Sequence, residues 1–309
     1  MFSQGDSLGR CPGGMLVLVA LLMVGVGGGA YAQNSDQPTP TDLARAEKLR
    51  EDTRRMIELA RDRVFPALVN VQVISVSYWG GKERKSTSVG SGTIISPQGH
   101  ILTNYHVASD GHKFKCTLAD KQEVSAELVG EDPLTDLAVL KLDLSELKDP
   151  QAPLVAAEFG DSDELEVGDY VMAMGSPWAL SRSVTLGIVS NTERVFASAS
   201  GGPGDMEIEQ GQRTGLFTRW IQHDAAIYHG SSGGPLVNLE GQIVGINEMG
   251  GSSGFGLAIP SNLAETVAAT LIEHGEVSRS WIGVSFRPIE KTGLEHGVLV
   301  NSVVKDGPA

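Results

Sequence analysis

From Ala67 onward, short runs of apolar and β-branched residues alternate with clusters of Gly, Pro, Asn and Asp. The runs recur about every 8–12 residues, a spacing typical of an antiparallel barrel or sandwich. We expect strands over 68–77, 92–96, 113–118, 123–129, 137–142, 170–174, 184–190, 235–238, 242–247 and 254–259. The pattern therefore predicts an all-β domain.

Two helical patterns flank this series of strands. Residues 41–64 carry apolar side chains at near-helical spacing among many Arg and Glu, and Thr41 is placed to cap the helix. A helix this charged is typical of a solvated flank, with packing on the main domain or on a neighbouring subunit as the alternative. A second helix is expected from Pro260 to about His274, where it would close the domain.

The first 32 residues have the pattern of an export signal. Arg10 gives a positive start, an apolar run covers 15–26, and Ala30-Tyr31-Ala32 has the small-x-small form that signal peptidase reads. The run is shorter than the roughly 20 apolar residues of a membrane-spanning helix. We expect a cleaved signal over 1–32 and an exported protein, periplasmic or extracellular; an uncleaved N-terminal anchor is the alternative. A polar spacer and the first helix follow over 33–64.

Composition and net charge limit the class of protein and the partners that this chain can have. A hydrophobic fraction of 41% and a charged fraction of 20% fit a globular protein with a core. The net charge of −14 argues against nucleic acid or anionic lipid as a partner. Cys11 lies in the expected signal, so Cys116 is left alone and cannot form an internal disulfide. The fold must then be held by its core and its hydrogen bonds.

Three segments carry the residue types that peptide hydrolysis requires: a nucleophile, a base within hydrogen-bond reach, and a group that orients the base. His106 follows an apolar strand, Asp136 precedes another, and Ser232 lies in a Gly-rich turn. Each segment alone is a weak signal, because such histidines are usually packed or solvated and Gly-Ser turns are common linkers. Their order within one all-β domain is that of the chymotrypsin-like triad. The order therefore indicates a serine hydrolase.

The turn around Ser232 also suits an oxyanion hole. Its glycines permit positive φ and a close approach of substrate. The N–H groups of Gly230 and Ser232 can then converge on one point, as stabilisation of a tetrahedral intermediate needs. The expected oxyanion-hole residues are Gly230, Ser231 and Ser232.

The sequence resembles the HtrA/Deg serine proteases over roughly residues 63–309. The resemblance rests on collinear motifs at 89–92, 103–107, 132–141, 184–190, 221–227, 230–238 and 254–260. It implies a chymotrypsin-like double antiparallel β-barrel over 65–276, with the active site between the two lobes. It also implies that His106 is the general base, that Asp136 orients it and that Ser232 attacks the scissile carbonyl.

Several positions depart from the family pattern. Ser231 stands where the family usually has Asn, His223 where it has Thr, and Tyr228-His229 where it has Asn-Pro. These changes leave the triad intact but affect loops that shape the cleft. No compact spacing joins the extra histidines to a carboxylate or thiolate, so we expect no metal, and this chemistry needs no organic cofactor.

The primary pocket of trypsin-like folds is lined by the residues just before the nucleophile turn, here Ala226, Ile227 and Tyr228. None is a carboxylate that could pair with a basic side chain. We therefore expect a small apolar pocket that prefers Val, Ala or similar residues at the cleavage position.

The segment 280–309 resembles the start of a PDZ domain, the peptide-binding module that follows the protease in this family. In such modules the N–H groups of a turn receive a C-terminal carboxylate, and the expected residues here are Ile282, Gly283 and Val284. A complete PDZ would bind C-terminal peptides. The printed sequence stops before the rest of that sheet and its groove helix.

The resemblance further implies unfolded or misfolded polypeptides as substrates, a role in protein quality control, and a homotrimer or higher homo-oligomer. The polar stretch 192–215 corresponds to a loop that couples PDZ and active site in relatives. Two other functions stay open at this point: a catalytically silent, chaperone-like scaffold of the same fold, and a hydrolase that acts on other esters.

Overall fold

The computed structural model describes residues 39–80, 82–176, 182–194, 218–250, 254–280, 282–287 and 297–308. The expected signal over 1–32 and most of the polar stretch 192–215 lie outside the described residues. The chain divides into two compact units, residues 1–47 and 48–309. In the first unit the structure describes only residue 39 and the beginning of the first helix.

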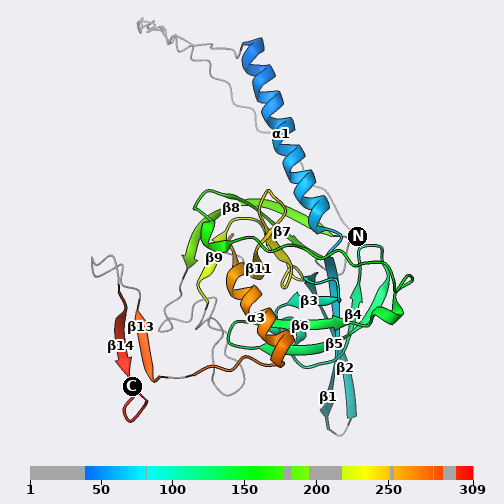
Figure 1. Cartoon of the computed structure of the whole chain (residues 1–309), viewed down its shortest axis with the longest axis vertical. Helices are drawn as coiled ribbons and strands as arrows, with labels where there is room; N and C mark the ends of the chain where they lie inside the picture. Colours follow the sequence, from blue (N-terminus) through cyan, green and yellow to red (C-terminus); the bar gives the residue numbers. More distant parts are fainter. Residues whose placement is uncertain are drawn as a thin grey trace, which may run out of the picture. The chain divides into compact units, whose positions relative to one another are not determined.

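Six antiparallel strands close the first barrel in the order β1-β2-β3-β6-β5-β4 (Figure 1). Their bounds are β1 (Leu68–Trp79), β2 (Lys82–Ile94), β3 (His100–Thr103), β4 (Gly111–Thr117), β5 (Glu123–Asp132) and β6 (Leu137–Leu142). The polar half of β2 was not predicted, because Lys82–Ser88 is exposed and has no apolar alternation. It is a strand because it pairs residue by residue with β1, from Trp79 opposite Lys82 to Leu68 opposite Thr93.

The second barrel also closes with six antiparallel strands, in the order β10-β11-β12-β9-β8-β7. They are β7 (Tyr170–Gly175), β8 (Ser183–Arg194), β9 (Trp220–His223), β10 (Pro235–Val237), β11 (Ile243–Gly250) and β12 (Gly256–Pro260). The prediction of an all-β double barrel is therefore confirmed. The expected loop start at Thr192 was wrong, since β8 runs on to Arg194 and pairs there with Trp220 of β9.

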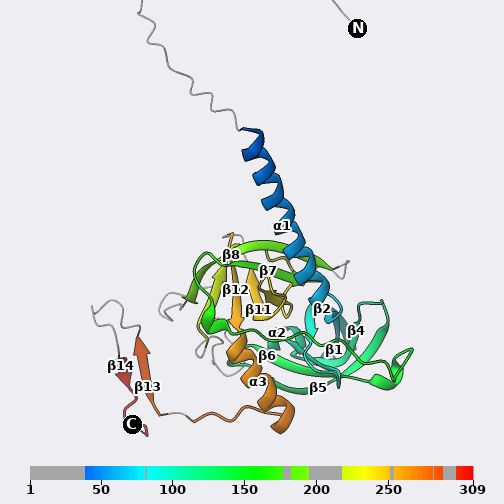
Figure 2. The same ribbon diagram turned by 45° about the horizontal axis from the view of Figure 1, so that its top comes forward.

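One apolar cluster fills the first barrel and continues into the second, through buried residues such as Leu102 and Leu140 in the first and Met172 and Ile246 in the second. Helix α3 (Ser261–His274) packs its buried Ala264, Val267 and Leu271 against β5, β6 and β11, and so contacts both barrels (Figures 1 and 2). A smaller cluster lies within the second barrel. Because the two barrels share core residues, the site between them has a common support.

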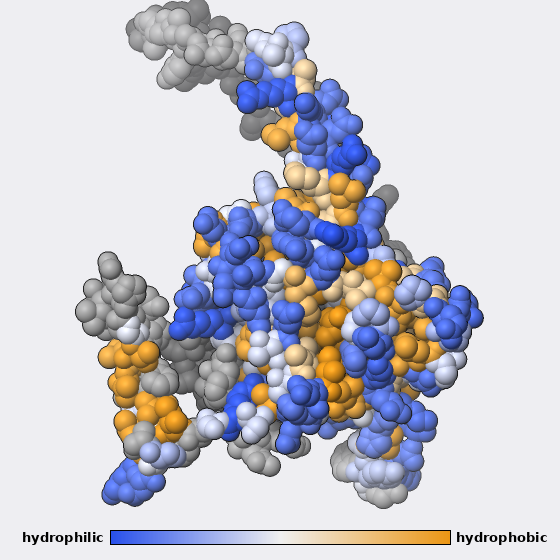
Figure 3. Space-filling model, in the orientation of Figure 1, coloured by the Kyte–Doolittle hydropathy of each residue, from blue (hydrophilic) through white to orange (hydrophobic). Residues whose placement is uncertain are grey.

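Helix α1 (Pro40–Val64) matches the first predicted helix. Thr39 caps it, not Thr41 as expected: Thr39 Oγ1 accepts from Asp42 N (3.2 Å), and Asp42 Oδ2 accepts from Thr39 N (3.1 Å). Pro40 suits the first helical turn because its missing N–H is not needed there. Only Ala60 and Val64 are buried, and the helix surface in Figure 3 is mostly hydrophilic.

Two short helical turns link strands, η1 (Leu144–Glu146) and η2 (Ser162–Glu164). A separate two-stranded antiparallel sheet is formed by β13 (Val284–Arg287) and β14 (Leu299–Val303). Gly283 has φ +74°, and its carbonyl accepts from Val304 N at 2.7 Å. None of the described helices has the length and apolar character needed to cross a membrane.

Candidate active site

His106 lies on α2 (Tyr105–Ala108), a single helical turn that directly follows β3. Its Nδ1 and Asp136 Oδ2 are 2.7 Å apart, and its backbone N–H donates to Asp136 Oδ1 at 2.9 Å. The carboxylate is 1% exposed, while 33% of the histidine side chain faces solvent. Because Nδ1 is engaged by the acid, Nε2 is the ring nitrogen left for proton transfer.

Asp136 lies in the turn between β5 and β6, with φ +56°. This left-handed conformation is uncommon for residues other than Gly, Asn and Asp. The backbone is held by its own carbonyl, which accepts from Tyr105 N (3.0 Å) and Asn104 Nδ2 (3.0 Å). The acid and the histidine are therefore fixed to each other through both backbone and side chain.

Ser232 lies in the turn between β9 and β10, and the first barrel holds this turn through Ser91 of β2. Ser91 Oγ donates to Gly230 O at 2.7 Å, and Ser91 N donates to Ser232 O at 2.9 Å. Thr103 Oγ1 in turn donates to Ser91 O at 2.7 Å. The buried Ser91 thus connects the nucleophile turn to the strand that precedes His106.

The Ser232 hydroxyl donates to the backbone carbonyl of Glu248 at 3.0 Å. Within the described residues no hydrogen bond joins Ser232 to His106. The Ser231 N–H is engaged by Tyr228 O at 2.8 Å, whereas the N–H groups of Gly230 and Ser232 donate to no described group. Gly230 has φ +93°.

The acids around His106 oppose the effect of burial on its pKa. Burial disfavours the imidazolium, but the hydrogen bond to Asp136 and the charges of Asp136 and Glu248 outweigh burial, so the pKa of His106 is raised. Burial, followed by the charge of Asp136, raises the pKa of Glu248 to about 8. The surroundings of His106 therefore stabilise its imidazolium form, as the expected role of general base requires.

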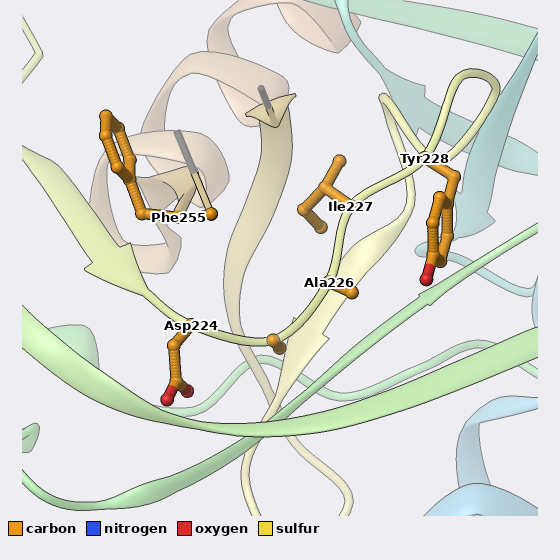
Figure 4. Close-up of a pocket in the computed structure, with 7 residues that line it drawn as sticks. Asp224, Ala226, Ile227, Tyr228 and Phe255 are labelled. Atoms are coloured by element: carbon orange, nitrogen blue, oxygen red, sulfur yellow. The ribbon is translucent and has the colours of Figure 1, made fainter. Parts of the chain in front are cut away.

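A hollow of about 180 Å³ lies beside the nucleophile turn and is lined by Asp224, Ala225, Ala226, Ile227, Tyr228, Gly254 and Phe255. All three residues expected for the primary pocket are among those that line this hollow. Figure 4 shows the Asp224 carboxylate turned away from Ile227 and Phe255. That carboxylate accepts from Ile188 N of β8 at 2.7 Å, so it is engaged by the wall of the barrel.

Comparisons with known proteins agree with this geometry. Residues 90–246 match the trypsin-like peptidase domain family. Over 242 residues the chain is 42% identical to a DegP-like periplasmic serine endoprotease of Pseudomonas fulva, covering 74% of this chain and 46% of that protein. A similar relative from Brucella suis is 42% identical over 241 residues, covering 74% of this chain and 43% of that protein.

The similar solved structures are also proteases. The HtrA-type protease AlgW with a tripeptide is 38% identical, with a TM-score of 0.63 over 82% of this chain and 77% of that one. A serine endoprotease from Yersinia pestis is 34% identical, with a TM-score of 0.57 over 82% and 76%. The chain belongs to the HtrA/Deg family of trypsin-like serine proteases. It spans about half the length of the curated relatives that it matches.

His223, which stands where the HtrA/Deg family usually has Thr, lies inside the second barrel. The ring is 0% exposed, and neither ring nitrogen has a hydrogen-bond partner within the described residues. Burial lowers the pKa of His223 to about 4. Gly256 makes room for the ring, since a Cβ there would overlap it. His223 is therefore a neutral core residue, and the described residues hold no group of three or more His, Cys, Asp or Glu placed to bind a metal.

Sequence reasoning missed three polar residues that support the HtrA/Deg site: Ser91, Glu248 and Arg279. Arg279 follows α3, and both of its terminal nitrogens bond the carboxylate of Asp132, which is 3% exposed. Asp132 also accepts from the Thr135 hydroxyl, one residue before Asp136. The motif that contains Ser91 had been recognised, but nothing local indicated its contact with Gly230, 139 residues away.

Proposed function

We propose that this protein is an exported serine endopeptidase that cleaves unfolded or misfolded polypeptides through an acyl-enzyme. The proposal rests on one observation: Ser91 connects the turn that carries Ser232 to the strand that precedes the fixed His106–Asp136 pair. A nucleophile, a base and an orienting acid on one rigid scaffold are what this chemistry requires.

In the proposed reaction, the Ser232 hydroxyl leaves the Glu248 carbonyl and turns to His106 Nε2. Its oxygen attacks the scissile carbonyl carbon while its proton passes to Nε2, and Asp136 stabilises the imidazolium. The N–H groups of Gly230 and Ser232, which donate to no described group, receive the oxyanion. The imidazolium then protonates the departing amine, and water attacks the acyl-enzyme with His106 again as base.

Substrate choice follows from the hollow beside the nucleophile. Ala226 and Ile227 offer no charge, and the Asp224 carboxylate is already bonded to β8. We therefore infer a preference for Val, Ala or similar residues at the cleavage position. A library of peptides with every residue at that position tests this, and preferential cleavage after Arg or Lys would contradict it.

The first test is labelling with a fluorophosphonate probe, with casein turnover followed in parallel. We expect both in the parent chain and neither in Ser232→Ala. Ser231→Ala, which removes the neighbouring hydroxyl, is the matched control and should still be labelled. A folded parent chain that takes up no label would favour the catalytically silent scaffold, whereas ester turnover without peptide turnover would favour the esterase.

We also propose periplasmic or extracellular export, assembly as a homotrimer or higher homo-oligomer, and the β13–β14 sheet as the start of a PDZ domain. The periplasmic relatives support export, and the resemblance of 280–309 supports the PDZ assignment. The oligomer is proposed from the resemblance to the HtrA/Deg family alone. Cell fractionation, light scattering on the purified protein, and binding of fluorescent C-terminal peptides test them in turn.

A further inference from the structure

The acid Glu248 occupies a β-bulge beside the active site. Along the β11–β12 pair, Asn247 lies opposite Ala258 and Met249 lies opposite Leu257, so Glu248 is the extra residue of β11. A bulge re-aims the side chain that it carries, and bulges are over-represented next to active sites. Here the acid is buried, since Glu248 is 3% exposed.

The main chain of this bulge supports the nucleophile turn. Glu248 O accepts the Ser232 hydroxyl at 3.0 Å, and the preceding Asn247 O accepts Gly233 N at 2.9 Å. The Asn247 side chain donates to Gly234 O at 3.1 Å. The backbone of the bulge that carries Glu248 is therefore bonded directly to the turn that carries Ser232.

Among the described residues, only one of the two carboxyl oxygens of Glu248 has a hydrogen-bond partner. Glu248 Oε2 accepts from Trp220 Nε1 of β9, whereas Oε1 is buried without a hydrogen-bond partner in the described structure. A buried acid that served only to bind Trp220 could be an amide at lower cost, because burying a carboxylate is expensive. The titratable groups that act on Glu248 are Asp136, before β6, and His106, on α2; Trp220 does not titrate.

We propose that Glu248 is a positioning residue of the protease site, a third acid whose charge acts on the His106–Asp136 pair and strengthens His106 as a base. The inference rests on the protease function proposed above. Burial and the charge of Asp136 raise the pKa of Glu248 to about 8, and its charge contributes to the raised pKa of His106. The two groups must then lose their protons in two coupled steps.

The decisive experiment follows the His106 ring by NMR against pH in full-length protein with ¹³C-labelled histidine and Ser232→Ala to prevent self-cleavage. We expect His106 to titrate in two steps in this parent. Glu248→Gln keeps the acceptor for Trp220 but cannot ionise, so one step should remain, lower by about half a pH unit or more. Glu248→Asp should retain both steps, and Glu265→Gln, an exposed control on α3, should change nothing.

Labelling of active protein by the fluorophosphonate probe is the second readout. At pH 9 Glu248→Gln should react roughly 3–10-fold more slowly than the parent, because His106 is then a weaker base. A single ordinary titration step of His106 in the parent, or superimposable curves for the parent and Glu248→Gln, would overturn the proposal. Absence of labelling in the parent would instead count against the protease function, and the NMR titration does not depend on activity.

Discussion

The two sides of the active site are built differently. On the base side, the first barrel fixes Asp136 and His106 through two contacts to the carboxylate and two hydrogen bonds to the Asp136 carbonyl. On the nucleophile side, the second barrel presents Ser232 in a glycine turn, and its hydroxyl is bonded to a main-chain carbonyl and not to His106. In the proposed reaction His106 is already oriented by Asp136, while the Ser232 hydroxyl must first turn away from the Glu248 carbonyl.

This difference indicates on which side of the site a change of conformation costs less free energy. Turning one hydroxyl costs far less than rebuilding a buried pair, because loss of one partner would leave a charge uncompensated. The second barrel also contains the ring nitrogens of His223 and Oε1 of Glu248, which are buried and have no hydrogen-bond partner among the described residues. We infer that changes on the base side act mainly through lost chemistry or stability, and that changes on the other side act through geometry and pH.

The largest effect is expected for Asp136→Asn. Asn tolerates φ +56° but cannot hold the required histidine tautomer, so kcat should fall by roughly four orders of magnitude. Peptidase kinetics with thermal unfolding in parallel measure this. Asp110→Asn, at an exposed position with φ +60°, is the matched control and should keep full activity. A loss below tenfold would show that the base side is less decisive than its geometry indicates.

Arg279→Gln should reduce the free energy of unfolding by about 3–4 kcal/mol, since it leaves the buried Asp132 carboxylate without its cation. Urea denaturation provides the measurement. The exposed pair Arg219–Glu193 gives the control, because Arg219→Gln should cost about 1 kcal/mol or less. Equal losses in both variants would mean that the Asp132 loop does not depend on the segment after α3.

His223 should make the second barrel sensitive to acid. Its folded pKa is about 4, below the ordinary value of 6.5, so the unfolded chain takes up a proton first as the pH falls. The free energy of unfolding should therefore drop by about 3 kcal/mol between pH 6.5 and pH 4, and no further below both values. Denaturation at several pH values should give a flatter curve for His223→Gln than for the exposed control His112→Gln. Parallel curves would contradict this assignment.

Gly233→Ala tests the nucleophile turn. A Cβ there would meet Ser91 O and the Thr103 hydroxyl, and φ +83° would strain the residue, so the oxyanion donors should shift and kcat should fall about 100-fold. Gly168→Ala is the control, since φ is +105° there but the space is open. It should cost stability through backbone strain and leave kcat within about twofold. Similar activity losses in both variants would indicate strain alone.

Much of this architecture could be predicted because the pattern is local. Alternating apolar residues marked the strands, and the order of His106, Asp136 and Ser232 suggested the constellation. The cap of α1 was misassigned because two threonines precede the same apolar pattern, and only the bonds to Asp42 distinguish Thr39. The bulge at Glu248 and the contact of Ser91 depend on pairing between distant strands, which periodicity does not encode.

The lone thiol of β4 has a practical consequence. Cys116 is 0% exposed, its neighbours across the sheet are Val71 and Val124, and burial raises the pKa of its thiol to about 12. The reactive thiolate is therefore almost absent while the first barrel is closed. In protein without residues 1–32, the rate at which Cys116 reacts with a thiol reagent therefore measures how often the first barrel opens. This measurement does not depend on catalysis.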